Sequence, residues 1–155
     1  MIIRPVGRDD ARTLFDWVNR EENRQVSLQT TAPVPWESHL AWLEARLSDR
    51  LSGQWIAEED GHPVGQVRLQ ERGHGLEVSV YVIPEQRGRA LALALVRHAV
   101  DEASRLWPER AVIARIRTNN AASLRLFAAA GFRLSQQCED HVLLAHVAGS
   151  HLPQR

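Results

Sequence analysis

Lysine is absent from this sequence, and all 19 side chains with a fixed positive charge are arginines. A catalytic lysine or a lysine Schiff base is therefore excluded. The phosphate-binding pattern Gly-x-x-x-x-Gly-Lys is excluded for the same reason. The sequence has one cysteine, Cys138, so no disulfide can form within the chain, which is typical of a reducing cytoplasm. We expect Cys138 to be a structural thiol.

Long apolar runs are missing as well. No stretch approaches the roughly 18 apolar residues of a membrane-spanning helix, and the first residues lack the apolar run of a signal peptide. Cysteine and histidine do not occur at zinc-ligand spacing. The formal net charge is zero, whereas nucleic-acid-binding proteins usually carry a basic balance. These observations predict a cytoplasmic protein with no metal, no membrane partner and no nucleic-acid partner.

What is present is the composition of a globular chain. Its 155 residues suit one ordinary domain, and 44% of them are hydrophobic. No internal repeat or low-complexity linker divides the sequence. We therefore predict a single domain over residues 1–155, in which residues 150–155 form a loose tail.

The apolar spacing predicts a regular succession of strands and helices. Asp60-Gly61 between two strand-like runs is a strong hairpin signal. Asp9-Asp10 should cap the first helix, and Asn120 and Gly131 should begin and end the last one. Such a mixture is typical of an α/β or α+β domain with helices on both faces of the sheet. The predicted order is strand 2–6, helix 11–18, helix 36–47 with Leu40, Leu43 and Leu47 on its apolar face, strands 54–59, 63–69 and 76–83, helix 93–106, strand 111–117, helix 121–130, and strands 132–137 and 141–147.

The most informative segment runs from Val80 to Leu95, where a strand ends, a short turn follows and a helix begins. A helix start exposes backbone N–H groups and the positive end of the helix dipole, and both favour a bound phosphate. Arg87 and Arg89 add charge, while Gly88 and Ala90 would let phosphate oxygens approach the backbone. The segment fits a pyrophosphate cradle, and an ordinary turn with solvated arginines fits it equally well.

Two motifs resemble those of the GNAT superfamily of N-acetyltransferases. The segment Arg87-Gly88-Arg89-Ala90-Leu91-Ala92 is similar to the acetyl-CoA signature Arg/Gln-x-x-Gly-x-Gly/Ala, with Ala90 where the family usually has glycine. A later segment resembles a second motif of the family, which is matched by Asn120, Ser123, Phe127 and Gly131-Phe132. The first three of these residues share one face of the predicted helix. The two motifs occur in the order of the family, separated by one helix and one strand, and the resemblance covers nearly the whole chain.

The resemblance implies a GNAT-like fold: a mixed, mostly antiparallel central sheet, splayed between two central parallel strands, with helices on both faces. It also implies that acetyl-CoA is the co-substrate and that an amine attacks its thioester directly in a ternary complex. A backbone N–H near Val82 would polarise the thioester carbonyl. The residues implied in cofactor binding are Val80, Tyr81, Val82, Arg87, Gly88, Arg89, Ala90, Leu91, Ala92, Asn120, Ser123 and Phe127.

Glu77 is the candidate general base, because it lies on the strand that would deliver the acetyl group, on the face opposite the Leu/Val stripe. His74, near the start of the same strand, is the second candidate, since a reference pKa of about 6.5 suits a base. In the family a tyrosine often protonates the leaving thiolate, but the matching position here is Phe127. Tyr81, the only tyrosine in the chain, is the candidate that replaces it.

The N-terminal third should cover the acceptor side of the site. Trp17, Asn19, Arg24, Trp36 and His39 resemble the N-terminal pattern of bacterial sugar-nucleotide amine N-acetyltransferases. Aromatic rings would stack there on a base or sugar, and Arg24 would pair with phosphate. Trp36 and His39 fit equally well as packing residues of a helix. The alternatives are a protein N-terminal amine, a polyamine or antibiotic acceptor, and a non-catalytic module that senses acyl-CoA; the C-terminal strand is a candidate homodimer interface.

Overall fold

The computed structural model describes residues 1–20, 33–73, 75–88 and 90–146. Its helices and strands follow the predicted order, and their boundaries agree with the predicted ones to within two residues. The strands are β1 Ile2–Pro5, β2 Gly53–Glu59, β3 His62–Glu71, β4 Leu76–Val82, β5 Val112–Arg117, β6 Phe132–Gln137 and β7 His141–His146. The described helices are α1 Ala11–Val18, α3 Trp36–Ser48, α4 Leu91–Leu106 and α5 Ala121–Ala129, with short 3-10 turns at Arg8–Asp10 and Pro84–Gln86.

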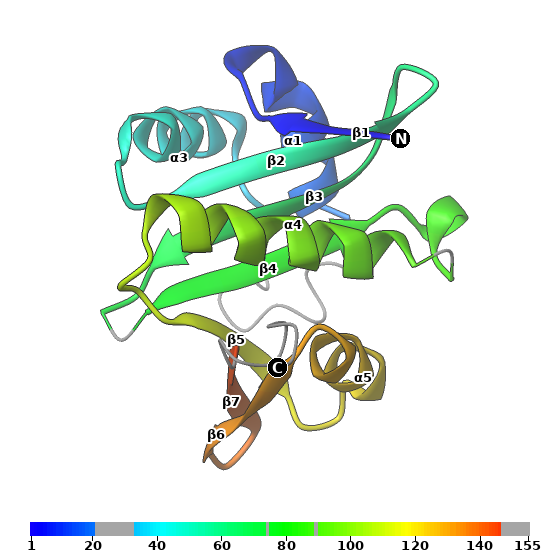
Figure 1. The fold of residues 1–155 in the computed structure, drawn as a ribbon. Coiled ribbons are helices and arrows are strands. Elements are labelled where there is room, and N and C mark those ends of the chain that lie inside the picture. Colours follow the sequence, from blue (N-terminus) through cyan, green and yellow to red (C-terminus); the bar gives the residue numbers. More distant parts are fainter. Residues whose placement is uncertain (21–32, 74, 89, 147–155) are drawn as a thin grey trace.

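The described strands form one sheet in the order β1-β2-β3-β4-β5-β7-β6 (Figure 1). Every neighbouring pair is antiparallel except β4 and β5, which run parallel. Helix α4 connects this pair, because parallel strands need a crossover long enough to return the chain to the same edge. The prediction of a mixed, mostly antiparallel sheet with a central parallel pair is confirmed.

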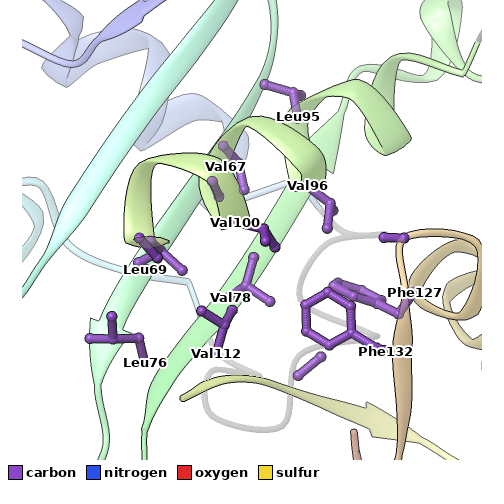
Figure 2. Packing of buried hydrophobic residues seen from close by; sticks show 14 of the residues in the cluster. Val67, Leu69, Leu76, Val78, Leu95, Val96, Val100, Val112, Phe127 and Phe132 are labelled. Atoms are coloured by element: carbon purple, nitrogen blue, oxygen red, sulfur yellow. The ribbon is translucent and has the colours of Figure 1, made fainter. Parts of the chain in front are cut away.

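Helices cover both faces of the sheet, as predicted. On one face α1 and α3 enclose a cluster that contains Leu14, Leu43 and Ile56. No helix within the described ranges is long and apolar enough to cross a membrane. On the other face α4 packs on β3 and β4, and its side chains share one hydrophobic core with both strands (Figure 2), which includes Val67, Leu69, Leu76, Val78, Leu95, Val96 and Val100.

Gly65 of β3 permits the close approach of α4. A Cβ atom at this position would lie 2.8 Å from the carbonyl oxygen of Tyr81 and 3.1 Å from Cδ1 of Leu95. These contacts are too short for a side chain, so the strand needs glycine where the helix crosses it. The helix therefore lies directly on β3 and β4, and this fixes its N-terminus next to the end of β4.

Two details of the predicted helices are wrong. Asp10 does not cap α1: its carboxylate accepts the Gly7 N–H at 2.9 Å and pairs with Arg4 at 2.8 Å. The hydrogen bond from Arg4 is the main reason why the pKa of Asp10 is lowered. In α3 the polar His39 is buried, whereas Leu47, expected on the apolar face, is 39% exposed. Contacts with the rest of the protein, and not only the apolar spacing of the sequence, determine which face of α3 is buried.

Candidate functional site

The central parallel strands separate soon after they meet. Strands β4 and β5 are paired only at Leu76 with Val112 and at Glu77 with Ile113. Beyond this point β4 continues to Val82 along β3, whereas β5 continues along β7. The predicted splay between the two central strands is confirmed, and it begins at Glu77.

Successive residues of β4 direct their backbone N–H and C=O groups alternately toward β3 and toward the opening between β4 and β5. The Ile83 N–H donates to the Val64 carbonyl at 3.0 Å, which places the odd-numbered residues of the strand in the hydrogen-bonded pairs with β3. The backbone groups of Val80 and Val82 consequently face the opening. Those of Tyr81 face β3, so in this register they point away from the opening.

The turn between β4 and α4 contains two residues in the left-handed backbone region. Gly88 has a φ of +84° and Ala90 a φ of +62°. Left-handed φ is unfavourable by roughly 1–2 kcal/mol for a residue with a Cβ, so Ala90 is strained where the GNAT signature usually has glycine. Ala90 is the N-cap residue of α4, and its methyl side chain cannot cap the helix. Because the first N–H groups of a helix have no partner inside it, they remain directed out of this helix end.

Arg87 ties the turn to the end of β4. Its Nε donates to the Val82 carbonyl at 3.0 Å, and its guanidinium lies 5.7 Å from the centre of the Tyr81 ring. Arg89, the other arginine of the turn, lies outside the described residues. Leu91 is buried in the core beneath α4, so only its backbone is available to a ligand. The turn therefore presents mainly backbone groups.

The α5 motif has structural partners. The Asn120 side chain accepts the Ser123 N–H at 3.1 Å and caps α5, which confirms the predicted cap. Phe127 is 4% exposed and packs edge-to-face on Phe132, with ring centres 5.1 Å apart (Figure 2). Phe127 belongs to the core that α4 and α5 share, and its contact with a cofactor stays a prediction.

The aromatic residues predicted to bind an acceptor pack against one another. Trp17 and His39 are each 4% exposed. His39 stacks between Trp36 and Trp42, with ring centres 6.3 and 5.7 Å apart, and burial lowers the pKa of His39. Trp17 lies 5.5 Å from the Tyr81 ring. The packing interpretation fits His39, and neighbouring aromatic rings contact both Trp17 and His39, whose contact with a substrate stays a prediction.

Asn19 is also used structurally. Its side chain accepts the Val34 N–H at 2.6 Å and donates to the Val34 carbonyl at 3.1 Å. These two bonds hold the chain that leads into α3, so the amide is not free to bind an acceptor. Arg24, a predicted acceptor ligand, and His74, the second candidate base, lie outside the described residues.

Arginines surround Glu77 on the face of the sheet that α1 and α3 cover. Glu77 is 7% exposed, and its Oε1 lies 3.6 Å from Nε of Arg72 and 3.4 Å from Nη2 of Arg115. Arg68 of β3 lies on the same face of the sheet as Glu77. Burial lowers the pKa of the Arg68 guanidinium to about 10. The positive charges of Arg72 and Arg46 lower this pKa further, and the negative charge of Glu77 opposes them.

Sequence reasoning found Glu77 but missed the arginines around it. One signal for Arg68 was available, because Gln66, Arg68 and Gln70 alternate with apolar residues along β3 and therefore share one face. No comparable signal existed for Arg115, which only the pairing of β4 with β5 brings beside Glu77.

Comparisons with known proteins agree with this geometry. The family model described as acetyltransferase (GNAT) domain matches residues 1–133. The chain is 29% identical over 145 residues to an L-methionine sulfoximine/L-methionine sulfone acetyltransferase of Salmonella typhimurium. It is 28% identical over 145 residues to the L-amino acid N-acyltransferase MnaT of Escherichia coli. Each of these alignments covers 88% of this chain and 82% of the relative.

Solved structures show the same fold. A ribosomal-protein-alanine N-acetyltransferase of Brucella melitensis is 26% identical, with a TM-score of 0.81 over 95% of this chain and 99% of that chain. The putative acetyltransferase yncA of Salmonella typhimurium, solved with acetyl-CoA, is 24% identical, with a TM-score of 0.80 over 97% and 95%. The chain thus belongs to the GNAT acetyltransferase family and is an acetyl-CoA-dependent N-acetyltransferase. The narrower resemblance to sugar-nucleotide enzymes gains no support from these relatives.

Proposed function

We propose that the protein transfers the acetyl group of acetyl-CoA to the primary amine of a small molecule. One observation carries the proposal. The left-handed turn at Gly88 and Ala90 sets the N-terminus of α4 next to the end of β4, and beyond Glu77 no strand of the described residues pairs with the edge of β4 that faces β5. A ligand with a diphosphate at one end and an amide-bearing arm would find backbone partners along one continuous path.

The diphosphate would bind at the N-terminus of α4. The backbone N–H groups of Gly88, Leu91 and Ala92 would donate to its oxygens there, and the helix dipole adds to the attraction. The pantetheine arm would then follow β4 like an added strand, with its amides against the backbone groups of Val80 and Val82. Such an arm would run from the end of β4 toward Glu77, where β4 and β5 meet.

The chemistry is a direct acyl transfer. The neutral amine nitrogen attacks the thioester carbon, a C–N bond forms, the C–S bond breaks, and coenzyme A leaves as a thiolate. A backbone N–H that faces the opening, at Val80 or Val82, would stabilise the carbonyl oxygen as it gains negative charge. Glu77 would accept the proton that the amine loses, directly or through water, a role worth about 10²–10⁴-fold.

Tyr81 is the proposed proton donor to the leaving thiolate. Its ring is 7% exposed and is held between Trp17 and the guanidinium of Arg87, so its orientation is fixed. The Tyr81→Phe variant tests this role by its rate of thiol release. An unchanged rate would remove Tyr81 from the chemistry, because a thiol pKa of about 8.5 allows water to protonate the thiolate instead.

Two observations bear on the acceptor. The Salmonella typhimurium and Escherichia coli relatives are named for amino-acid substrates, which supports a small amine rather than a sugar nucleotide. A protein N-terminal amine is the second candidate, since the Brucella melitensis enzyme of the same fold is named for ribosomal-protein alanine.

The test is thiol release from acetyl-CoA with a panel of amines, together with acetyl-CoA titration. Release that requires both acetyl-CoA and an amine supports the proposal, whereas acetyl-CoA binding without turnover of any amine favours a non-catalytic module. Arg87→Ala should weaken acetyl-CoA binding more than Glu77→Gln does. Arg97→Ala, on the exposed side of α4, is the control that should bind normally. Equal losses in all three variants would contradict these roles.

A further inference from the structure

The opening between β4 and β5 begins at a very short parallel ladder. Among the described residues, the two strands pair only at Leu76 with Val112 and at Glu77 with Ile113. Parallel pairing is slightly less stable per residue than antiparallel pairing, so two residue pairs define the angle between the strands only weakly. The segments that enter the two strands must therefore help to fix where the opening begins.

The segment that enters β4 is packed closely against the segment that enters β5. The Leu76 N–H donates to the Ala111 carbonyl at 2.7 Å. A Cβ atom on Gly75 would lie 2.8 Å from the same carbonyl oxygen, so the close approach of the two backbones needs glycine there. Figure 1 shows the chain from α4 to β5 passing beside the start of β4.

An ion pair joins the same two segments. Glu71, the last residue of β3, is the register partner of Leu76. Its Oε1 accepts a hydrogen bond from Nη2 of Arg110, which lies two residues before β5. Its Oε2 accepts the Gly73 N–H at 3.2 Å. One carboxylate thus ties the turn between β3 and β4 to the segment before β5.

The setting of this ion pair favours a role in geometry over a role in stability. The Glu71 and Arg110 side chains are 32% and 30% exposed. Ion pairs that water reaches contribute little to the free energy of unfolding. Arg72, in the same turn, has its Nε 3.6 Å from Oε1 of Glu77. A displacement of the turn would therefore move the Glu77 backbone and also a charge beside the Glu77 carboxylate.

We propose that Glu71 and Arg110 are positioning residues, which hold β4 against β5 at the closed end of the opening and so place Glu77 for acyl transfer. The inference rests on the proposed function, which makes Glu77 the base. It adds two residues that act through Glu77 and not on the reacting atoms. A misplacement of about 1 Å at a reacting centre can lower a rate by about 10²-fold, so a small shift of the ladder is enough.

Hydrogen exchange of the Leu76 amide in the ligand-free protein measures the geometry directly. Exchange should be about twofold to fivefold faster in Glu71→Gln and in Arg110→Gln, the range expected when a partly exposed ion pair is lost. The charge-reversed double variant, Glu71→Arg with Arg110→Glu, should slow the exchange again. Arg105→Gln breaks the ion pair with Glu102 inside α4 and is the matched control with unchanged exchange.

The kinetics of thiol release then test the consequence for the reaction. In both single variants kcat should fall about tenfold to hundredfold, and the double variant should recover it. The dissociation constant of acetyl-CoA and the denaturation midpoint should stay near their wild-type values, which a purely structural role would not allow. Gly75→Ala should reproduce both effects without a change in charge, because its Cβ pushes the Ala111 carbonyl away.

The outcomes separate this inference from the proposed function. Faster exchange and lower kcat in both single variants, restored together by charge reversal, support it. Wild-type exchange and kcat in both single variants overturn it, as does a fall in kcat that only follows a matching loss of global stability. Absence of thiol release by the wild-type protein with every amine would contradict the proposed function, whereas the exchange rates would still test whether the ion pair holds the two strands.

Discussion

The two sides of the site are built from different parts of the chain. The proposed donor side consists of the edge of β4 and the turn into α4, which are contiguous in sequence and offer mainly backbone groups. The proposed acceptor side consists of side chains from β3, β4 and β5, which are far apart in sequence. Backbone groups can bind a cofactor whatever the side chains are, whereas selection among acceptors requires side chains of particular charge and shape.

The largest effect should come from Glu77→Gln, which tests the acceptor side. We expect kcat to fall by about 10²–10⁴-fold, because an amide of nearly the same shape cannot accept the proton of the amine. The dissociation constant of acetyl-CoA should not change, since the donor side stays intact. Thiol-release kinetics and acetyl-CoA titration measure the two quantities. Glu109→Gln, on an exposed segment after α4, is the control, and a wild-type kcat for Glu77→Gln would place the base elsewhere.

Gly88→Val tests the donor side. A β-branched residue at a φ of +84° should distort the turn at a cost of roughly 1–2 kcal/mol, and acetyl-CoA should bind about tenfold more weakly. The KM of the amine should hardly change. Gly7→Val is the matched control, because Gly7 has a negative φ and open space around its Cβ position. If the two glycine variants bind acetyl-CoA equally well, the turn does not hold the diphosphate.

Ala90→Gly should have a smaller effect of the opposite sign. Glycine removes the left-handed strain but gains entropy in the unfolded chain, so the net stabilisation should reach at most about 1 kcal/mol. Chemical denaturation measures this change in the free energy of unfolding. Ala128→Gly, exposed within α5, should instead destabilise the protein by about 1 kcal/mol. A loss of stability in both variants would show that the left-handed Ala90 carries no strain.

The smallest effect concerns pH and α3, which covers the face of the sheet on which Glu77 lies. Burial holds the pKa of His39 below its ordinary value. As the pH falls, this histidine therefore becomes protonated in the unfolded chain before it does so in the folded chain. The free energy of unfolding should therefore fall as the pH drops below about 6.5, the pKa of an unfolded-state histidine. His39→Gln should flatten this dependence, whereas His62→Gln, which is exposed, should not. An undiminished slope in His39→Gln would assign the dependence to another group.

Much of the fold could be predicted from local pattern. Alternating apolar residues located β4, and Asn120 predicted the cap of α5, because both signals act over a few neighbouring residues. Local pattern did not decide how His39 and Phe127 are packed, because their side chains are buried by contacts with residues distant in sequence or on other elements. A motif can indicate which residues a helix face carries, but not which neighbours will enclose them.

The sequence by itself determined the order of the elements, the turn at Gly88 and Ala90, and the position of Glu77 on its strand. Each depends on local backbone preference or on the two-residue period of a strand. Only the tertiary structure decided that β4 and β5 separate beyond Glu77 and that Arg68 and Arg115 stand on either side of it. Strand register brings residues from distant segments to within a few ångströms, and no local pattern encodes that distance.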